Sequence, residues 1–234
     1  LNNIQQYNDI EGIRKLVTRQ SMSNFVDLCH QLRFQVRWAQ TPRVPKTSVL
    51  GHSMLVAAIS YFFVRELAPT PKRIYNAFFG GLYHDLPEAV TRDIISPVKN
   101  SSAELDSLIK TLERTLADEE IFPHVEPFMV DELKYFAQEE FSNKIIVDGE
   151  VRCGLEFADL HENYNKDEFS PYDGQIIRAS DHLSTFLEAW HSCESGIRSD
   201  ELRNSYKKIR ESYEGRCFGP INLSDVYSGY SDHD

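Results

Sequence analysis

Two residues that are costly to bury stand side by side where the sequence predicts the buried end of a helix. His84 and Asp85 directly follow the apolar run 77–83, and Glu88 comes three positions after Asp85. Imidazole and carboxylate groups are tolerated in such a place when they are paired or when they bind a cation. Glu88, at the i+3 position, would lie on the same helical face as Asp85, within reach of a water bound to that cation.

Two further groups of the metal-binding type occur on predicted apolar helices. His52 starts one helix, and Asp181 lies inside another, between small residues and an apolar run. Two imidazoles and two carboxylates that converge from helix ends would suit a divalent cation with positions left open for water. The candidate ligands are therefore His52, His84, Asp85 and Asp181.

Each candidate also has an ordinary structural explanation. His52 alone could be a helix-terminal or hydrogen-bonded core histidine, and the dipeptide His84–Asp85 could occur by chance. Asp181 could form an ion pair with Arg178 or Lys207. The order of these residues on three apolar helices is what favours the metal hypothesis over the separate explanations.

The elements that must position these residues are predicted to be helices. Apolar residues recur at helical spacing over much of the chain, and the expected helices are 21–36, 52–67, 71–83, 103–120, 126–141, 174–193 and 199–214. The segment 52–67 is apolar on nearly every face, which indicates a central buried helix. The segment 103–120 is amphipathic, with its apolar face formed by Leu105, Leu108, Ile109, Leu112 and Leu116.

One stretch departs from the helical pattern. Asp148-Gly149, flanked by β-branched residues, predicts a β-hairpin within 144–157. We expect this hairpin to be a small insertion that is a satellite to the helical core. The tail 215–234 is rich in glycine and serine and is expected to pack loosely or fray. With no internal repeat or domain boundary in view, we expect residues 1–234 to form a single all-α domain.

Composition narrows the class of protein and of partner. The chain of 234 residues is 41% hydrophobic and 26% charged, as in soluble globular proteins. A net charge of −11 disfavours a nucleic-acid polymer as partner. No apolar run is long enough for a membrane span, and no signal peptide is visible. Four cysteines without a CxxC pair suggest reduced thiols and a cytoplasmic location: Cys29, Cys153, Cys193 and Cys217.

The motifs around the candidate ligands resemble those of the HD-domain metal-dependent phosphohydrolases, and among these the bacterial 5'-deoxynucleotidases. The resemblance covers roughly residues 22–100 and the helix around Asp181. It rests on the sequences RW (37–38), GHSMLVA (51–57), HDLPEAVTRDIISPVK (84–99) and RASDHLSTFLEA (178–189). The resemblance implies an all-α HD-domain helical bundle that binds one divalent cation, with cobalt, manganese, magnesium, zinc and iron not distinguishable from sequence.

The resemblance also implies roles for individual residues. The metal ligands would be His52, His84, Asp85 and Asp181. Glu88 would handle a proton or orient the metal-bound water, and Asp93 would lie near the phosphoester and the sugar. Which of these two is acid and which is base stays open. Arg37 would orient the phosphate, Trp38 would pack on the sugar, and the substrate pocket would be lined by Asp93, Ile94, Ile95 and Ser96.

These roles have competing explanations. Arg37 and Trp38 could be an exposed charge and a core aromatic residue, and Glu88 and Asp93 could be acidic residues that favour a helix N-terminus. The sequence departs from the family pattern in Gly51, where close relatives carry an acidic residue, and in the long segment between Asp85 and Asp181. Both departures bear on the substrate more than on the chemistry.

The resemblance thus implies a metal-dependent phosphomonoesterase that hydrolyses nucleoside or deoxynucleoside 5'-monophosphates and acts as a homodimer. The sequence predicts no binding to a membrane. The alternatives are an HD phosphohydrolase or phosphodiesterase for another small phosphate ester, and a catalytically silent helical binding module. A second metal would be a minor alternative and would use some of the remaining histidines, His124, His161, His182 and His191.

Overall fold

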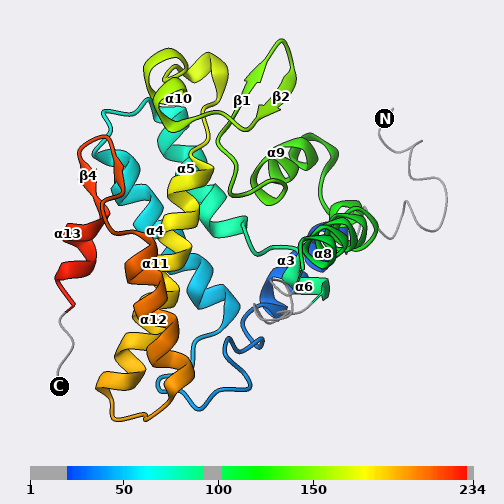
Figure 1. Ribbon diagram of the computed structural model, residues 1–234. Coiled ribbons are helices and arrows are strands. Elements are labelled where there is room, and N and C mark those ends of the chain that lie inside the picture. The colour runs from blue at the N-terminus through cyan, green and yellow to red at the C-terminus, as the bar shows by residue number, and fades with distance from the viewer. Residues whose placement is uncertain (1–19, 92–101, 231–234) are drawn as a thin grey trace.

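The computed structural model describes residues 20–91 and 102–230 and consists mainly of α-helices (Figure 1). The all-α prediction is confirmed. In chain order the helices are α3 (Gln20–Gln31), α4 (Val49–Arg65), α5 (Pro71–Tyr83), α6 (Glu88–Thr91), α8 (Ala103–Leu116), α9 (Pro127–Ala137), α10 (Phe157–Asn163), α11 (Gly174–Glu194), α12 (Asp200–Ser212) and α13 (Leu223–Ser228). Shorter π-helical or 3-10 turns occupy Ala117–Ile121, Phe122–His124 and Asp167–Phe169. Within the described residues, no helix is both long and apolar enough to cross a membrane.

The helices gather around α11. Figure 1 shows α11 running beside α4 and α5, with α12 packed against it and α13 nearby. A buried apolar cluster joins these elements through residues such as Val64, Phe186, Leu202 and Tyr227. The helices α3, α6, α8 and α9 lie on the other side of α5 (Figure 1) and enclose a second cluster around Leu86 and Ile121. Residue 84 therefore follows α5 at the junction of the two clusters.

Local sequence explains where the two site-bearing helices begin and end. The Ser48 Oγ accepts a hydrogen bond from the Gly51 N–H at 3.1 Å and caps α4. Pro71 stands in the first turn of α5, where its missing N–H costs nothing. The predicted helix 71–83 is confirmed, and the expected helix from residue 52 in fact starts three residues earlier. His52 consequently lies in the first turn of α4.

A close approach of α5 to α4 brings His84 towards His52. A Cβ atom on Gly81 would lie 2.8 Å from the Ala57 Cα and 2.9 Å from the Ala57 backbone nitrogen, which no side chain tolerates. Gly81 precedes His84 by one helical turn, and Ala57 follows His52 by about one and a half turns. The absent side chain thus sets the distance between the two histidine-bearing helices.

Two predictions about buried faces are wrong in part. The helix α4 is not buried all round, because α5 and α11 cover only part of its circumference. The predicted apolar face of α8 is buried at Ile109 but not along its whole length. The exposed apolar residues on these helices are Met54, Leu55 and Phe62 of α4, and Leu108 and Leu112 of α8.

The predicted hairpin is confirmed as an antiparallel pair of β1 (Lys144–Val147) and β2 (Glu150–Cys153). Asp148 and Gly149 form its turn with φ of 53° and 81°, a backbone that favours glycine at the second position. The expectation of a satellite is wrong for β1. Lys144 and Ile145 are each only 1% exposed, and the Lys144 backbone pairs with that of Tyr172. Only β2 lies wholly on the surface.

The expectation of a loosely packed tail is wrong for the described part, 215–230. A short antiparallel pair of β3 (Cys217–Phe218) and β4 (Ile221–Asn222) leads into α13. Leu223 and Tyr227 are 1% and 2% exposed and belong to the apolar cluster around α11. The tail is rich in glycine and serine, but Leu223 and Tyr227 are four positions apart. One turn of helix therefore places both side chains on the same buried face.

A buried ion pair fixes α5 against the start of α11. The Arg73 Nε donates to Asp173 Oδ2 at 2.8 Å and its Nη2 donates to Oδ1 at 2.6 Å, and both side chains are fully buried. The third contact of this guanidinium is His161 Nδ1, at 3.1 Å from Nη1. Asp173 immediately precedes α11, so the pair fixes the end of the helix that carries Asp181.

Replacing Asp173 tests how much of the fold depends on this pair. We expect Asp173→Ala to lower the free energy of unfolding by about 3–5 kcal/mol, because Arg73 is left as an uncompensated buried charge. Chemical denaturation measures the loss. The matched control is Asp200→Ala, which removes an exposed partner of Arg203 and should cost about 1 kcal/mol or less. Equal losses in the two variants would contradict the structural importance of the buried pair.

Candidate metal centre

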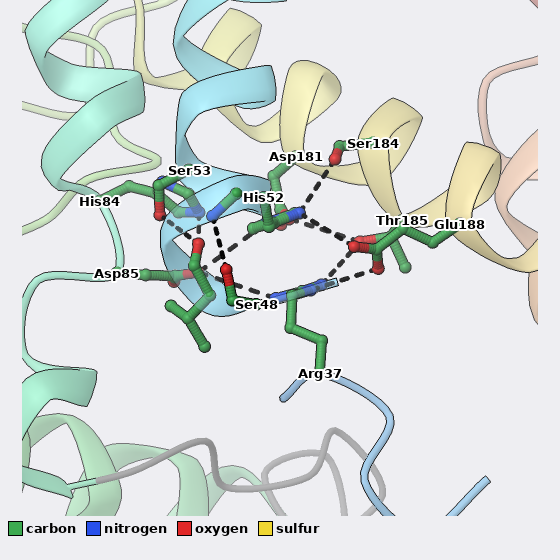
Figure 2. Close-up of polar contacts among 12 residues, drawn as sticks. Arg37, Ser48, His52, Ser53, His84, Asp85, Asp181, Ser184, Thr185 and Glu188 are labelled. Carbon is green, nitrogen blue, oxygen red and sulfur yellow. Dashed lines mark hydrogen bonds and ion pairs between the residues drawn. The ribbon is translucent and has the colours of Figure 1, made fainter. Parts of the chain in front are cut away.

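Three of the four candidate ligands form a compact cluster. His52 from α4, His84 from the end of α5 and Asp181 from the middle of α11 place one ligand atom each within 4.8 Å of one another (Figure 2). Both histidines are buried, and Asp181 is partly exposed. Within residues 20–91 and 102–230, this is the one group of three or more such side chains with that proximity. Asp181 could have formed an ion pair with Arg178 or Lys207, but among the described residues its carboxylate lies against His52 instead.

Asp85 lies at the edge of the same cluster. Its Oδ2 is 3.1 Å from His84 Nε2 and 3.8 Å from His52 Nε2, while Asp181 Oδ1 is 2.9 Å from His52 Nε2. The structure therefore brings together all four residues that the sequence singled out as ligands. Their carboxylate oxygens and imidazole nitrogens face a common region (Figure 2).

Hydrogen bonds fix which nitrogen of each imidazole faces the cluster. His52 Nδ1 is 2.9 Å from Ser184 Oγ, and His84 Nδ1 is 2.8 Å from the Gly81 carbonyl oxygen. A carbonyl oxygen only accepts, so His84 Nδ1 carries a proton, and its Nε2 is directed at the cluster. Metal-binding histidines in proteins are held in the same way through their second nitrogen.

The electrostatics of the cluster are those of two carboxylates beside two imidazoles. Burial lowers the pKa of His52, and the charge of Arg37 lowers it further. Burial would also lower the pKa of His84, but the charge of Asp85 outweighs it and raises the pKa to about 9. Burial opposes ionisation of Asp85 and Asp181, yet the neighbouring imidazoles hold the pKa of both carboxyls well below the usual range. Both acids are therefore ionised at neutral pH.

The donor set fits a divalent cation. The Nε2 atoms of His52 and His84 are buried and make no hydrogen bond of good geometry, although a carboxylate oxygen lies close to each. A buried nitrogen without a hydrogen bond is costly, and a cation between the imidazoles and the carboxylates would remove that cost. Nitrogen and oxygen donors in this number suit several divalent metals, so the set does not select one.

Arg37 is part of this site and is not an exposed charge. Its Nη1 lies 3.7 Å from Asp85 Oδ2, its Nε donates to Glu188 Oε2 at 3.2 Å, and its Nη2 donates to Thr185 Oγ1 at 3.1 Å. The side chain is 14% exposed. Burial opposes the charge, but the surrounding carboxylates, Glu188 above all, raise the pKa of Arg37 above its usual range. The residue is a fixed cation at the edge of the cluster (Figure 2).

Trp38 is half-buried and packs against the apolar cluster around α11. Its indole Nε1 donates to Glu188 Oε2 at 2.9 Å. The alternative that Trp38 is a core aromatic residue therefore describes only part of its environment. The Glu188 carboxylate that accepts a hydrogen bond from Arg37 also accepts one from Trp38.

Glu88 is buried at the start of α6, and its charge is close enough to raise the pKa of Arg37. Its backbone oxygen accepts a hydrogen bond from Gln35 Nε2 at 2.8 Å. The other proposed site residues, Asp93, Ile94, Ile95 and Ser96, lie outside the described residues. The histidines of the second-metal alternative make contacts elsewhere: His161 with Arg73, His182 with Tyr213 and His124 with Asn24.

Three residues of the site were not anticipated from sequence. Ser184, Thr185 and Glu188 follow Asp181 at positions i+3, i+4 and i+7 of α11, so all four lie on one helical face. A signal was present: polar residues repeat at this spacing inside an otherwise apolar segment, DHLSTFLE. Reading the helix for its polar face would have found them.

The model of the HD domain family matches residues 29–210, and the chain belongs to that family. Proteins of this family bind divalent metals, and the cluster of His52, His84 and Asp181 is where such an ion fits this chain. Among solved structures, an HD-domain phosphohydrolase from Listeria innocua has the same fold, with a TM-score of 0.64 at 18% identity, and the match covers 88% of this chain and 85% of the other.

Two curated relatives are named as a nucleotidase and as a phosphatase. A 5'-deoxynucleotidase from Pasteurella multocida is 23% identical over 187 residues, which are 74% of this chain and 88% of that protein. A 4'-phosphooxetanocin A phosphatase from Priestia megaterium is 40% identical over 85 residues, 35% of this chain, and the match spans 43% of that relative. The expected likeness to HD-domain phosphohydrolases and 5'-deoxynucleotidases is confirmed.

Removing one anionic donor tests the metal centre. We expect Asp85→Ala to lose bound divalent metal, because the variant keeps the imidazoles but loses one of two carboxylates in the cluster. Elemental analysis after dialysis against buffer with a trace of metal measures occupancy. Asp159→Ala is the control, since Asp159 is exposed and contacts Asn163 on its own helix. Full metal content in Asp85→Ala would remove Asp85 from the ligand set.

Ser184 provides a milder test of the same centre. We expect Ser184→Ala to weaken metal affinity about 10- to 100-fold, because His52 loses the partner that orients its ring. The control is Ser180→Ala, also a buried serine of α11, whose hydroxyl donates to the Ile176 carbonyl oxygen at 2.9 Å. Competition with a chelating dye measures both affinities. Equal effects would mean that the loss reflects helix stability and not the orientation of His52.

Proposed function

We propose that the chain is a metal-dependent phosphomonoesterase that hydrolyses nucleoside or deoxynucleoside 5'-monophosphates to a nucleoside and phosphate. The observation that carries this proposal is the position of Arg37, whose Nη1 lies 3.7 Å from Asp85 beside the imidazole–carboxylate cluster. A planar guanidinium binds phosphate oxygens with two donors, and a fixed one next to a metal centre defines a phosphate position. Similarity to a 5'-deoxynucleotidase supports the same chemistry.

In this proposal the ligands are His52, His84, Asp85 and Asp181. A divalent cation bound there would lower the pKa of a water molecule towards neutrality and would polarise a phosphoryl oxygen. Arg37 binds and orients the phosphate group. Glu88, buried and close to Arg37, holds or accepts a proton at its carboxylate.

The nucleoside part of the substrate is assigned to neighbouring residues. Trp38 would pack against the sugar. The roles that the resemblance implies for Asp93 and for residues 93–96, which lie outside the described residues, stay predictions. A tight apolar wall leaves no partner for a 2'-hydroxyl, so deoxynucleotides are the favoured substrates. The homodimer that the resemblance implies stays a prediction.

Two alternatives have different consequences. Another small phosphate ester as substrate is supported by the similarity to a phosphatase named for a 4'-phosphate. A silent binding module would need no second buried acid such as Glu88 beside the metal centre. Release of phosphate from a substrate panel separates all three.

The test is phosphate release from dAMP, AMP and non-nucleotide phosphomonoesters with cobalt, manganese or magnesium. We expect metal-dependent release, faster from dAMP than from AMP. Arg37→Ala should lower kcat/KM about 10- to 100-fold for both nucleotides. The variant loses a hydrogen bond to the charged phosphate group, which the two substrates share. Malachite-green detection of phosphate measures the rates.

Arg203→Ala is the control for Arg37→Ala, because Arg203 lies exposed on α12 beside Asp200. Its kinetics should match the wild type. No phosphate from any ester with any of the metals would refute a phosphatase and favour the binding module. Release from non-nucleotide esters alone would move the substrate class and leave the phosphohydrolase chemistry intact.

A further inference from the structure

Glu188 is a buried acid on the same face of α11 as Asp181. Its side chain is 5% exposed, and a carboxylate in such a place is costly unless it is paired. One oxygen, Oε2, accepts hydrogen bonds from both Arg37 Nε, at 3.2 Å, and Trp38 Nε1, at 2.9 Å. Two consecutive residues of a loop are thus held by one atom of a helix.

The contacts of Arg37 determine which of its edges faces the histidine–carboxylate cluster. The guanidinium has five N–H donors. Its Nε–H is taken by Glu188, and one Nη2–H is taken by Thr185 at 3.1 Å. The remaining N–H donors are the two on Nη1 and the second one on Nη2. Together Nη1 and Nη2 form the end of the guanidinium group that is farthest from the backbone. Nη1 lies 3.7 Å from Asp85 Oδ2, so Glu188 and Thr185 direct this end towards the metal cluster (Figure 2).

The backbone at Trp38 needs support that the loop alone does not supply. Trp38 has φ of 58°, a left-handed conformation that is unfavourable for a bulky residue. The conformation is stabilised by a turn in which Thr41 N–H donates to the Trp38 carbonyl oxygen at 2.9 Å and by the indole bond to Glu188. Strained residues of this kind persist where the surroundings fix them, and they cluster at functional sites.

We propose that Glu188 is a positioning residue for the phosphate site: it holds Arg37 with its Nη edge directed at a substrate phosphate oxygen, and it fixes Trp38 beside it. The inference rests on the proposed phosphomonoesterase function. Glu188 itself does not touch the substrate in this arrangement. Its effect on catalysis passes through Arg37, because a misdirected guanidinium still binds phosphate but no longer places it over the metal centre.

The kinetic test compares two substitutions at Glu188. We expect Glu188→Leu, which removes both acceptor oxygens, to lower kcat/KM for the best phosphate ester about 10- to 100-fold with metal content unchanged. Glu188→Gln keeps one acceptor oxygen and should recover activity to within about fivefold of the wild type. The matched control is Glu201→Leu, since Glu201 accepts a hydrogen bond from Thr41 of the same loop at 2.7 Å, and it should change kcat/KM by about twofold or less.

A double-mutant cycle tests whether Glu188 acts through Arg37. In the Arg37→Ala background, Glu188→Leu should lower kcat/KM by about threefold or less, because the group that it positions is already absent. This double variant also removes both partners of the ion pair, so it reports on the site without an unpaired buried charge. An undiminished loss in that background would overturn the proposal.

A readout independent of activity is the indole N–H of Trp38. The chain has two tryptophans, so Trp190→Phe leaves Trp38 as the single indole signal in a ¹⁵N-correlated NMR spectrum. Adding Glu188→Leu should shift this signal and speed its exchange with water, while adding Glu201→Leu should leave it in place. If the wild type releases phosphate but Glu188→Leu leaves the Trp38 indole signal in place, only the positioning role of Glu188 is overturned. If the wild type releases no phosphate from any ester while Glu188→Leu does shift the Trp38 signal, the proposed function is overturned. The effect of Glu188 on catalysis is then overturned with it, although Glu188 does hold Trp38.

Discussion

The close approach of charged groups at the crossing of α4, α5 and α11 is the constraint on which the rest of the site depends. His52, His84 and Asp181 present ligand atoms within 4.8 Å of one another, and Asp85 and Arg37 stand at the edge. So much charge in a largely buried region is unfavourable unless each group has a partner of opposite charge or a bound cation. The partners come from the loop that carries Arg37, from α4, from the end of α5 and from α11.

Packing decides how precisely the partners meet. The contact between Gly81 and Ala57 sets the separation of the two histidine-bearing helices. The buried pair of Arg73 and Asp173 fixes the start of α11 against α5, and Asp181 lies about two turns further along that helix. The geometry of the histidine–carboxylate cluster is therefore a property of interhelical distances set by a small residue and an ion pair, several residues away from the clustered side chains.

Local pattern was a reliable guide to helices and to the hairpin, and a poor guide to burial. Pro71 and the Asp148-Gly149 turn each specify a local backbone, and α5 and the hairpin formed as predicted. The Ser48 cap was not predicted, and it starts α4 three residues before the expected position. The exposed Phe62 of α4 and Leu108 of α8, and the buried Tyr227 of the tail, were the opposite of what periodicity and composition suggested. Whether an apolar face is covered depends on which other elements reach it, and no local pattern contains that information.

The sequence by itself determined the candidate ligands: residue types and motif spacing selected His52, His84, Asp85 and Asp181. The helical spacing of DHLSTFLE also puts Ser184, Thr185 and Glu188 on the face of Asp181, although their part in the site was not anticipated. Only the tertiary structure decided which groups pair across that face. Arg37 and Glu188 are 151 positions apart in the chain, and nothing in the sequence indicates that one oxygen of Glu188 receives both Arg37 and Trp38. The physical reason is that helix periodicity fixes directions within a few turns, whereas contacts between distant segments follow from how whole helices pack.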